Sequence, residues 1–305
     1  MALNVVLRSL IVIVAALPLF AQQEEAPERV PPTPTPEARP IRSAVELQYY
    51  RFGNFFQAGS GAPERQVNAL GAAYRAAWAP KTGGPDLYGR VSALRYSGGA
   101  SETSYTGQVG VSKYGSVHWY DVYLEQTWNG YAFDIDETRA SADITALAGH
   151  YSYAITPEWR VGTDVYFDWT RFDVDANLEN DYRSLGFDVR YRGFGDLFQP
   201  RLGYVAGERE SQNAADDASD RYWFLEVRSK VSDAIDVRLR YRDRTREYDN
   251  IAREDERAQW TLRGTLKQNE RLTWNASYMT EDVDSSLPGR DFDRSTAYIG
   301  VTYGF

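Results

Sequence analysis

Arginine occupies every second position in one stretch of the chain, from residue 238 to residue 246. The apolar residues Val237, Leu239 and Tyr241 lie between these arginines. Successive side chains of a β-strand point to opposite faces, so the stretch predicts five guanidinium groups on one face and apolar groups on the other. Guanidinium groups bind carboxylates and phosphates, and the pattern therefore predicts a surface that attracts anions. The five residues are Arg238, Arg240, Arg242, Arg244 and Arg246.

Other charged residues follow the same alternation in neighbouring segments. The basic ones are Arg190, Arg192, Arg228, Lys230, Arg263 and Lys267. The acidic ones are Asp121, Glu125, Asp164, Asp168 and Asp188. Two interpretations stay open: the charges select solutes, or the arginines form salt bridges with Asp188, Glu226 or Asp243 that only stiffen the molecule.

Residues for covalent or metal chemistry are scarce. The sequence has no cysteine, which excludes disulfides, thiolate metal sites, a cysteine nucleophile and a lipid-anchored N-terminal cysteine. His118 and His150 are the only histidines, and neither is expected near a serine with an orienting acid. The aspartate-rich stretches around residues 216 and 282 lack the spacing of a calcium loop. We therefore predict no enzyme activity, no metal and no cofactor.

The first 43 residues predict an export signal and a tail. Arg8 precedes an apolar run from Leu10 to Phe20, and the small residue Ala21 ends it, so residues 1–21 are expected to be a signal peptide. Residues 22–43 are rich in proline and glutamate and predict an extended periplasmic segment. That tail is either a flexible spacer or a tether that contacts peptidoglycan or a periplasmic partner.

Residues 44–305 show a period of two throughout. In the last stretch Ala297, Ile299 and Val301 alternate with small or polar residues. Each alternating segment predicts a β-strand with one apolar and one polar face. The fourteen predicted segments are 44–53, 67–78, 86–96, 103–113, 117–127, 139–153, 158–172, 182–192, 199–207, 220–231, 235–246, 257–267, 271–281 and 294–305.

The connections and the aromatic residues favour a membrane barrel over a soluble sandwich. Short turns, such as 232–234 and 268–270, alternate with longer polar loops. Trp159 and Trp169 bracket one strand's apolar face, as amphipathic rings do at the two headgroup levels of a membrane. The segment lengths suit strands that cross a bilayer at a tilt. The predicted fold is therefore all-β, a transmembrane antiparallel up-and-down β-barrel of about 14 strands.

The formal net charge of -9 conceals two opposite regions. The five long predicted loops carry a net charge of -19, and the residues outside the signal, the tail and these loops carry +10. The acidic balance of the whole chain argues against a nucleic-acid partner. The loops in question are 127–138, 173–181, 208–220, 247–256 and 281–293.

The C-terminal segment Tyr298-Ile-Gly300-Val-Thr-Tyr303-Gly-Phe305 resembles the assembly signal of bacterial outer-membrane β-barrels. In that signal a polar or aromatic residue is followed by glycine and then by two aromatic residues, the last of which ends the chain. The resemblance implies a porin-like protein of a Gram-negative outer membrane. It also implies that the assembly machinery reads Tyr298, Gly300, Tyr303 and Phe305, and that the protein contacts outer-membrane lipid and lipopolysaccharide.

The predicted barrel is too wide for side chains to fill. Fourteen tilted strands about 4.8 Å apart give a backbone radius of roughly 14 Å. Tyr50, Tyr88, Tyr96 and Tyr166 are expected to point inward and narrow it. The favoured function is a channel for small hydrophilic solutes, anions in particular. Two alternatives remain: an export barrel for polysaccharide or protein, and a structural barrel that docks a periplasmic or surface partner.

Overall fold

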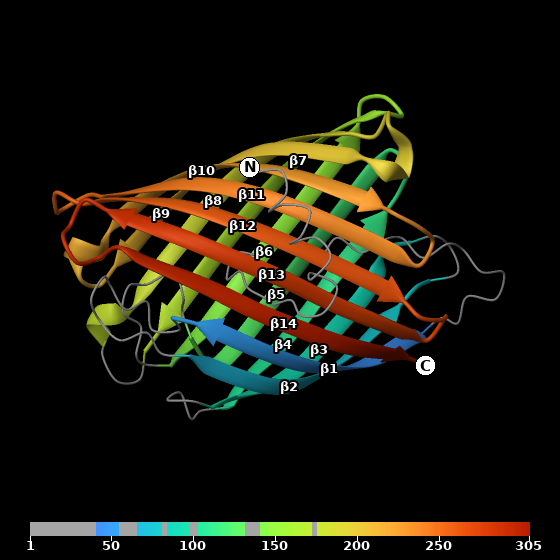
Figure 1. The fold of residues 1–305 in the computed structure, drawn as a ribbon, viewed down its shortest axis with the longest axis horizontal. Coiled ribbons are helices and arrows are strands. Elements are labelled where there is room, and N and C mark those ends of the chain that lie inside the picture. The colour runs from blue at the N-terminus through green and yellow to red at the C-terminus, as the bar shows by residue number, and fades with distance from the viewer. Residues whose placement is uncertain (1–40, 55–65, 81–83, 98–102, 132–140, 173–175) are drawn as a thin grey trace, which may run out of the picture.

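The computed structural model describes residues 41–54, 66–80, 84–97, 103–131, 141–172 and 176–305. In these residues fourteen antiparallel strands form one closed barrel, which confirms the predicted fold class (Figure 1). None of the helices in the described part of the chain is long and apolar enough to cross a membrane. The signal peptide and residues 22–40 of the tail lie outside the described residues.

The strands run to and fro along the barrel in chain order. They are β1 (Ile41–Gly53), β2 (Val67–Trp78), β3 (Asp86–Ser97), β4 (Thr103–Tyr114), β5 (His118–Gly130), β6 (Ala142–Ala154), β7 (Trp159–Arg171), β8 (Asn180–Tyr191), β9 (Gln199–Ser211), β10 (Ala218–Lys230), β11 (Ile235–Tyr248), β12 (Glu254–Lys267), β13 (Leu272–Ser285) and β14 (Phe292–Gly304). Three single-turn 3₁₀-helices lie in the connections: η1 (Ala176–Leu178), η2 (Gly195–Leu197) and η3 (Ala214–Asp216).

The first and last strands close the ring. Each strand pairs with its neighbours in the chain, and β1 pairs with β14 from Ala44 opposite Gly304 to Gly53 opposite Ser295. Beyond that pairing, the amide of Phe305 donates a hydrogen bond to the carbonyl of Ser43 at 2.9 Å. Closure leaves no sheet edge, as a strand structure in hydrocarbon requires.

The outer face is apolar and edged by aromatic rings. Aliphatic side chains such as Leu70, Val109 and Leu202 are more than half exposed on it. Seven of the eight tryptophans are also exposed there, and only Trp119 is buried on the inner face. Apolar side chains exposed around the whole ring are stable only against lipid, and the tryptophans near the strand ends match the headgroup levels. The seven are Trp78, Trp128, Trp159, Trp169, Trp223, Trp260 and Trp274.

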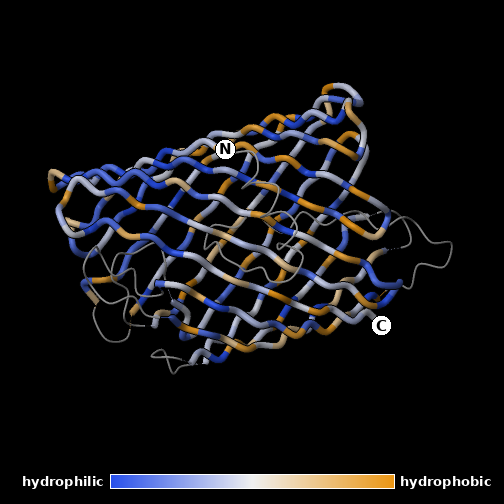
Figure 2. Tube along the Cα trace, viewed as in Figure 1, coloured by the Kyte–Doolittle hydropathy of each residue, from blue (hydrophilic) through white to orange (hydrophobic). Residues whose placement is uncertain are grey.

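At the end of the barrel opposite the C-terminus, several strands continue beyond their predicted ends. Three of the five predicted long loops shorten to residues 212–217, 249–253 and 286–291, because β9 to β14 extend into them. In Figure 2 these strand ends are coloured mostly hydrophilic. The predicted strands ended where apolar residues ceased to alternate, but charged residues alternate equally well in a strand that projects into water. At the other end of the molecule, β1 starts at Ile41, three residues inside the predicted tail.

The inner face is polar apart from aromatic clusters. Tyr50 and Tyr96 are buried together with Phe52, Tyr131 and Tyr298 on β1, β3, β14 and the residue after β5. Tyr88 and Tyr123 form a second cluster, with Tyr166 packed against it. The four tyrosines predicted to point inward therefore do so.

Candidate functional site

The arginine column of β11 lies on the inner face of the barrel. Arg242, Arg244 and Arg246 are buried, whereas Leu239 on the opposite face is 44% exposed. Arg238 and Arg240 lie on the same inner face and keep part of their surface exposed. Because an arginine on the lipid face is costly, the apolar residues between the arginines fix this orientation.

Carboxylates of β10 and β13 pair with Arg242, Arg244 and Arg246, which form the half of the column far from the C-terminal end of the barrel. Asp220 on β10 is fully buried and accepts hydrogen bonds from both Arg244 and Arg246, the latter from its Nε at 2.9 Å. Glu281 on β13 lies 3.6 Å from Arg242 and 2.5 Å from the Nε of Arg294. These groups form a network that holds the guanidinium planes against the wall.

Of the three acids predicted as salt-bridge partners of the arginine column, one pairs with it. Glu226 does pair with Arg238, at 3.7 Å. Asp188 instead binds Arg201 of β9, at 2.8 Å. Asp243 lies between inward-facing arginines in the sequence and so belongs to the outer face. Salt bridges therefore hold part of the column, and of its partners Glu226 was predicted from the sequence whereas Asp220 and Glu281 were not.

Basic side chains outnumber acidic ones on the inner face. At the inward positions of the described strands, eighteen are basic and twelve are acidic. The basic residues are Arg42, Arg75, Arg90, Arg160, Arg190, Arg201, Arg209, Arg228, Lys230, Arg238, Arg240, Arg242, Arg244, Arg246, Arg257, Arg263, Lys267 and Arg294. The acidic residues are Glu46, Asp86, Asp121, Glu125, Asp164, Asp168, Asp188, Asp220, Glu226, Asp236, Asp255 and Glu281.

The middle of the basic wall combines arginine with aromatic rings. The guanidinium carbon of Arg240 lies 4.0 Å from the ring centroid of Phe224, and that of Arg201 lies 5.2 Å from the same ring. Arg242 stacks in the same way on Tyr222, at 5.3 Å. Such stacking orients a guanidinium without neutralising it. Arg201 and Arg242 are buried and also pair with Asp188 and Glu281, so Arg240 is the most exposed of the three.

The predicted acidic residues occupy another sector. Asp121 and Glu125 lie on β5, where Asp121 accepts a hydrogen bond from Tyr88 at 2.7 Å and Glu125 accepts one from Gln108 at 3.2 Å. Asp164 and Asp168 lie on the inner face of β7. In a ring of this strand order β5 lies opposite β12, so acidic and basic sectors face each other across the barrel.

Several of the predicted basic residues lie outside the β11 network. Arg190 stacks over Trp119 at 5.7 Å and so belongs with the acidic sector. Arg228 pairs with Asp236 near the opposite end of β10. Lys267 is exposed at the end of β12, whereas Arg263, four residues earlier, lies on the wall next to Arg238. Arg192 follows the end of β8 and is exposed.

Several inward-facing charges were missed or misplaced by sequence reasoning. Arg201, Arg209, Arg257 and Arg294 face inward on β9, β12 and β14. Asp220, Asp255 and Glu281 were counted among the surface acids of the predicted loops, and all three are buried on the inner wall. The net charge of +10 assigned to the wall was therefore too high. The run Arg253-Glu-Asp255-Glu-Arg257 contains no apolar residue, so local alternation could not place its side chains.

The predicted assembly residues lie on both faces of the closing strand. Tyr298 points inward and hydrogen bonds to Glu46 of β1, and its ring covers Gly300, where any Cβ would collide with it. Tyr303 and Phe305 lie on the outer face in an edge-to-face contact, with ring centroids 5.3 Å apart. Both are exposed at the end of the barrel that holds the C-terminus (Figure 1).

Comparison with known proteins relates this barrel to porin-like folds. Residues 219–305, which include β11 to β14 and nearly all of β10, match the family model described as "Putative beta-barrel porin 2". The chain has a porin-like outer-membrane β-barrel fold. No curated protein matches its sequence.

Two solved structures share this fold. One is an outer membrane channel from Pseudomonas putida F1, with a TM-score of 0.50 and 12% identity over 88% of this chain and 97% of that one. The other is a variant of the TodX monoaromatic hydrocarbon channel, with a TM-score of 0.52 and 9% identity over 88% of this chain and 90% of that one. An anion-selective porin from Comamonas acidovorans is also similar, with a TM-score of 0.45 and 9% identity over 87% and 98% of the two chains.

Proposed function

We propose that this barrel is a passive channel of the bacterial outer membrane that passes small hydrophilic solutes and favours anions. The observation that carries the proposal is the excess of basic side chains on the inner wall, concentrated on β9 to β12. A low-dielectric wall with fixed charges of one sign raises the local concentration of the opposite ion. The porin family match of the C-terminal strands supports a channel rather than an enzyme.

Arg240 and Arg263 are the groups best placed to act on a solute. Both keep part of their surface exposed on the inner wall, whereas Arg244 and Arg246 are buried against Asp220. A guanidinium with part of its surface in water can meet a solute anion directly, whereas the guanidiniums of Arg244 and Arg246 are buried and out of its reach. Selectivity in this account therefore depends on the exposed arginines, and the buried pairs support them.

The proposed route to the membrane uses the two ends of the chain. Residues 1–21 direct export, and the C-terminal segment that ends at Phe305 is read by the assembly machinery. The folded barrel then contacts outer-membrane lipid with its apolar belt and lipopolysaccharide with its charged rim. In this proposal residues 22–40 contact a periplasmic partner.

The test is ion selectivity in planar bilayers. The double variant Arg240→Gln/Arg263→Gln should keep the single-channel conductance of an open pore and shift the zero-current potential in a KCl gradient away from the chloride equilibrium value. The matched control is Arg183→Gln, which removes an exposed arginine that pairs with Glu208 and Glu210 on the outer surface. Equal potentials for the double variant and wild type would refute the selectivity role, and a barrel without conductance would refute the channel.

A further inference from the structure

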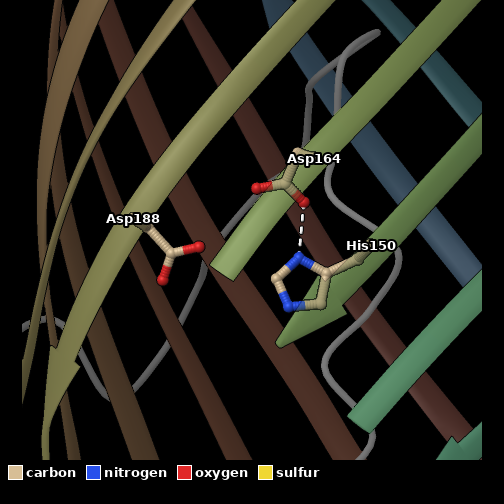
Figure 3. Close-up of side chains that lie close together, drawn as sticks. All are labelled: His150, Asp164 and Asp188. Carbon is tan, nitrogen blue, oxygen red and sulfur yellow. Dashed lines mark hydrogen bonds and ion pairs between the residues drawn. The ribbon is translucent and has the colours of Figure 1, made fainter. Parts of the chain in front are cut away.

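Three side chains that could bind a metal ion converge on the inner wall, on the adjacent strands β6, β7 and β8. His150 and Asp164 face each other across β6 and β7, with His150 Nδ1 and Asp164 Oδ1 2.6 Å apart. Asp188 of β8 points toward the same space (Figure 3). One candidate ligand atom from each residue lies within 4.8 Å of the other two. A small movement of these side chains would bring all three within bonding distance of one ion.

A glycine creates the space in which the three residues meet. Gly162 of β7 lies directly opposite Asp188. A Cβ at this position would be 2.3 Å from Asp188 Oδ2 and 3.1 Å from His150 Cε1. The side chains from β6 and β8 therefore approach each other over the bare backbone of β7, and any other residue at position 162 would separate them.

The histidine has unused coordinating capacity. Its side chain is only 9% exposed and packs on Trp119, with ring centroids 4.4 Å apart. His150 Nε2 is buried and has no hydrogen-bond partner among the described residues. A buried nitrogen without a partner is unfavourable, and a metal ion would satisfy it if the ring turned. Such a turn would break the hydrogen bond to Asp164, which is itself a candidate ligand.

The surrounding charged residues determine how tightly the site can bind a cation. Asp121 lies directly opposite His150 on β5 and adds a third carboxylate. Arg201 opposes cation binding: it holds Asp188 through two hydrogen bonds of 2.8 Å and lies 3.5 Å from Asp164. Arg160 and Arg190 face inward on the same strands. This balance favours weak, reversible binding of an ion that prefers nitrogen, and disfavours Ca²⁺ and Mg²⁺, which require several oxygen ligands.

We propose that His150, Asp164 and Asp188 form a binding site for a late first-row divalent ion, with Zn²⁺ as its test probe, on the inner wall of the barrel. Sequence analysis predicted no metal site because the three residues are separated along the chain and only strand pairing unites them. The site requires a folded barrel but no ion conduction, so its test is independent of the proposed channel function.

The direct test is isothermal titration of the folded barrel in detergent with Zn²⁺, and separately with Ca²⁺. Wild type should bind one Zn²⁺, and His150→Gln and Asp164→Asn should each weaken binding by at least about tenfold, as loss of even a ligand-orienting group does. His118→Gln is the matched control: this other histidine is exposed and contacts Tyr151, and its loss should leave the affinity unchanged. Circular dichroism verifies that each variant folds.

Arg201→Gln separates a metal site from a purely structural cluster. Removing the competing guanidinium should strengthen Zn²⁺ binding. If the cluster is only an ion-pair network, neither wild type nor Arg201→Gln should bind Zn²⁺. Gly162→Ala should weaken it by separating Asp188 from His150. The proposal is overturned if His150→Gln binds Zn²⁺ as tightly as wild type, if the signal follows His118, or if Ca²⁺ binds equally well.

Discussion

The most strongly organised residues on the inner wall are pairs of arginines that share one buried carboxylate. Asp220 binds Arg244 and Arg246, and Asp255 binds Arg253 at 2.7 Å with Arg257 at 3.4 Å. Each carboxylate thus has two cations beside it, so the groups are paired and yet leave net positive charge on the wall. These residues therefore both stabilise the wall and give it a positive charge.

Asp220→Asn tests the scaffold role. Asparagine preserves the shape but leaves Arg244 and Arg246 buried without their carboxylate, and breaking a buried pair in this way costs about 3–5 kcal/mol. We expect the free energy of unfolding, measured with urea in detergent or lipid, to fall by an amount of that order. Glu247→Gln is the control, because it breaks the exposed pair with Arg221 and should cost no more than about 1 kcal/mol. Similar losses for both variants would contradict the scaffold role.

Each strand is an element with two opposite surfaces. Leu185 and Ser184 are neighbours on β8, yet Leu185 is 46% exposed on the outer face and Ser184 lies half-buried on the inner face. This alternation determines both the membrane belt and the polar wall. A single-residue shift of register would exchange the two faces, which is why the pattern specifies the register so strongly.

An arginine on the outer face of β8 should lower the free energy of unfolding more than an arginine on its inner face. Leu185→Arg puts a charge on the lipid face near the middle of the strand and should lower the free energy of unfolding by about 2–4 kcal/mol. Ser184→Arg adds the same side chain one residue away, where it faces the polar interior, and should cost clearly less. Reversible unfolding in lipid vesicles measures both, and a larger loss for Ser184→Arg would contradict the assigned orientation.

The closing strand provides a prediction about assembly. Phe305→Ala removes the terminal aromatic ring, which contacts Tyr303, and should reduce the amount of folded barrel in the outer membrane of expressing cells. The same variant should refold from urea into detergent as well as wild type does, because the loss concerns recognition. Phe198→Ala, at another exposed aromatic residue, is the control. Normal outer-membrane levels of Phe305→Ala would refute the assembly role.

The sequence predicts the elements better than it predicts their ends and partners. Period-two alternation identified all fourteen strands because each has one face in lipid and one in a polar interior. It failed where both faces meet water, so the outer ends of β9 to β13 were taken for loops and Glu281 for a surface acid. The register between strands determines which side chains pair. The Arg244–Asp220 pair and the His150 cluster therefore cannot be predicted from any local sequence pattern.

At the scale of the whole molecule, acidic and basic regions are separated in space. Exposed acids such as Glu208 and Glu210 lie on the outer rim, and the arginines of β9 to β12 line the inner wall. Charges in water are screened over about 8 Å at physiological ionic strength, so the rim and the wall act on a solute separately. A net charge of -9 for the chain is thus compatible with an interior that attracts anions.

The zero-current potential of the wild-type protein in a planar bilayer tests this account most directly. With dilute KCl on one side and more concentrated KCl on the other, reconstituted barrels should show stable single-channel steps. The zero-current potential should lie toward the chloride equilibrium value, and the preference should decrease as both solutions are made more concentrated, because salt screens the wall. A potential toward the potassium equilibrium value, or an absence of conductance steps from a correctly folded barrel, would contradict the account.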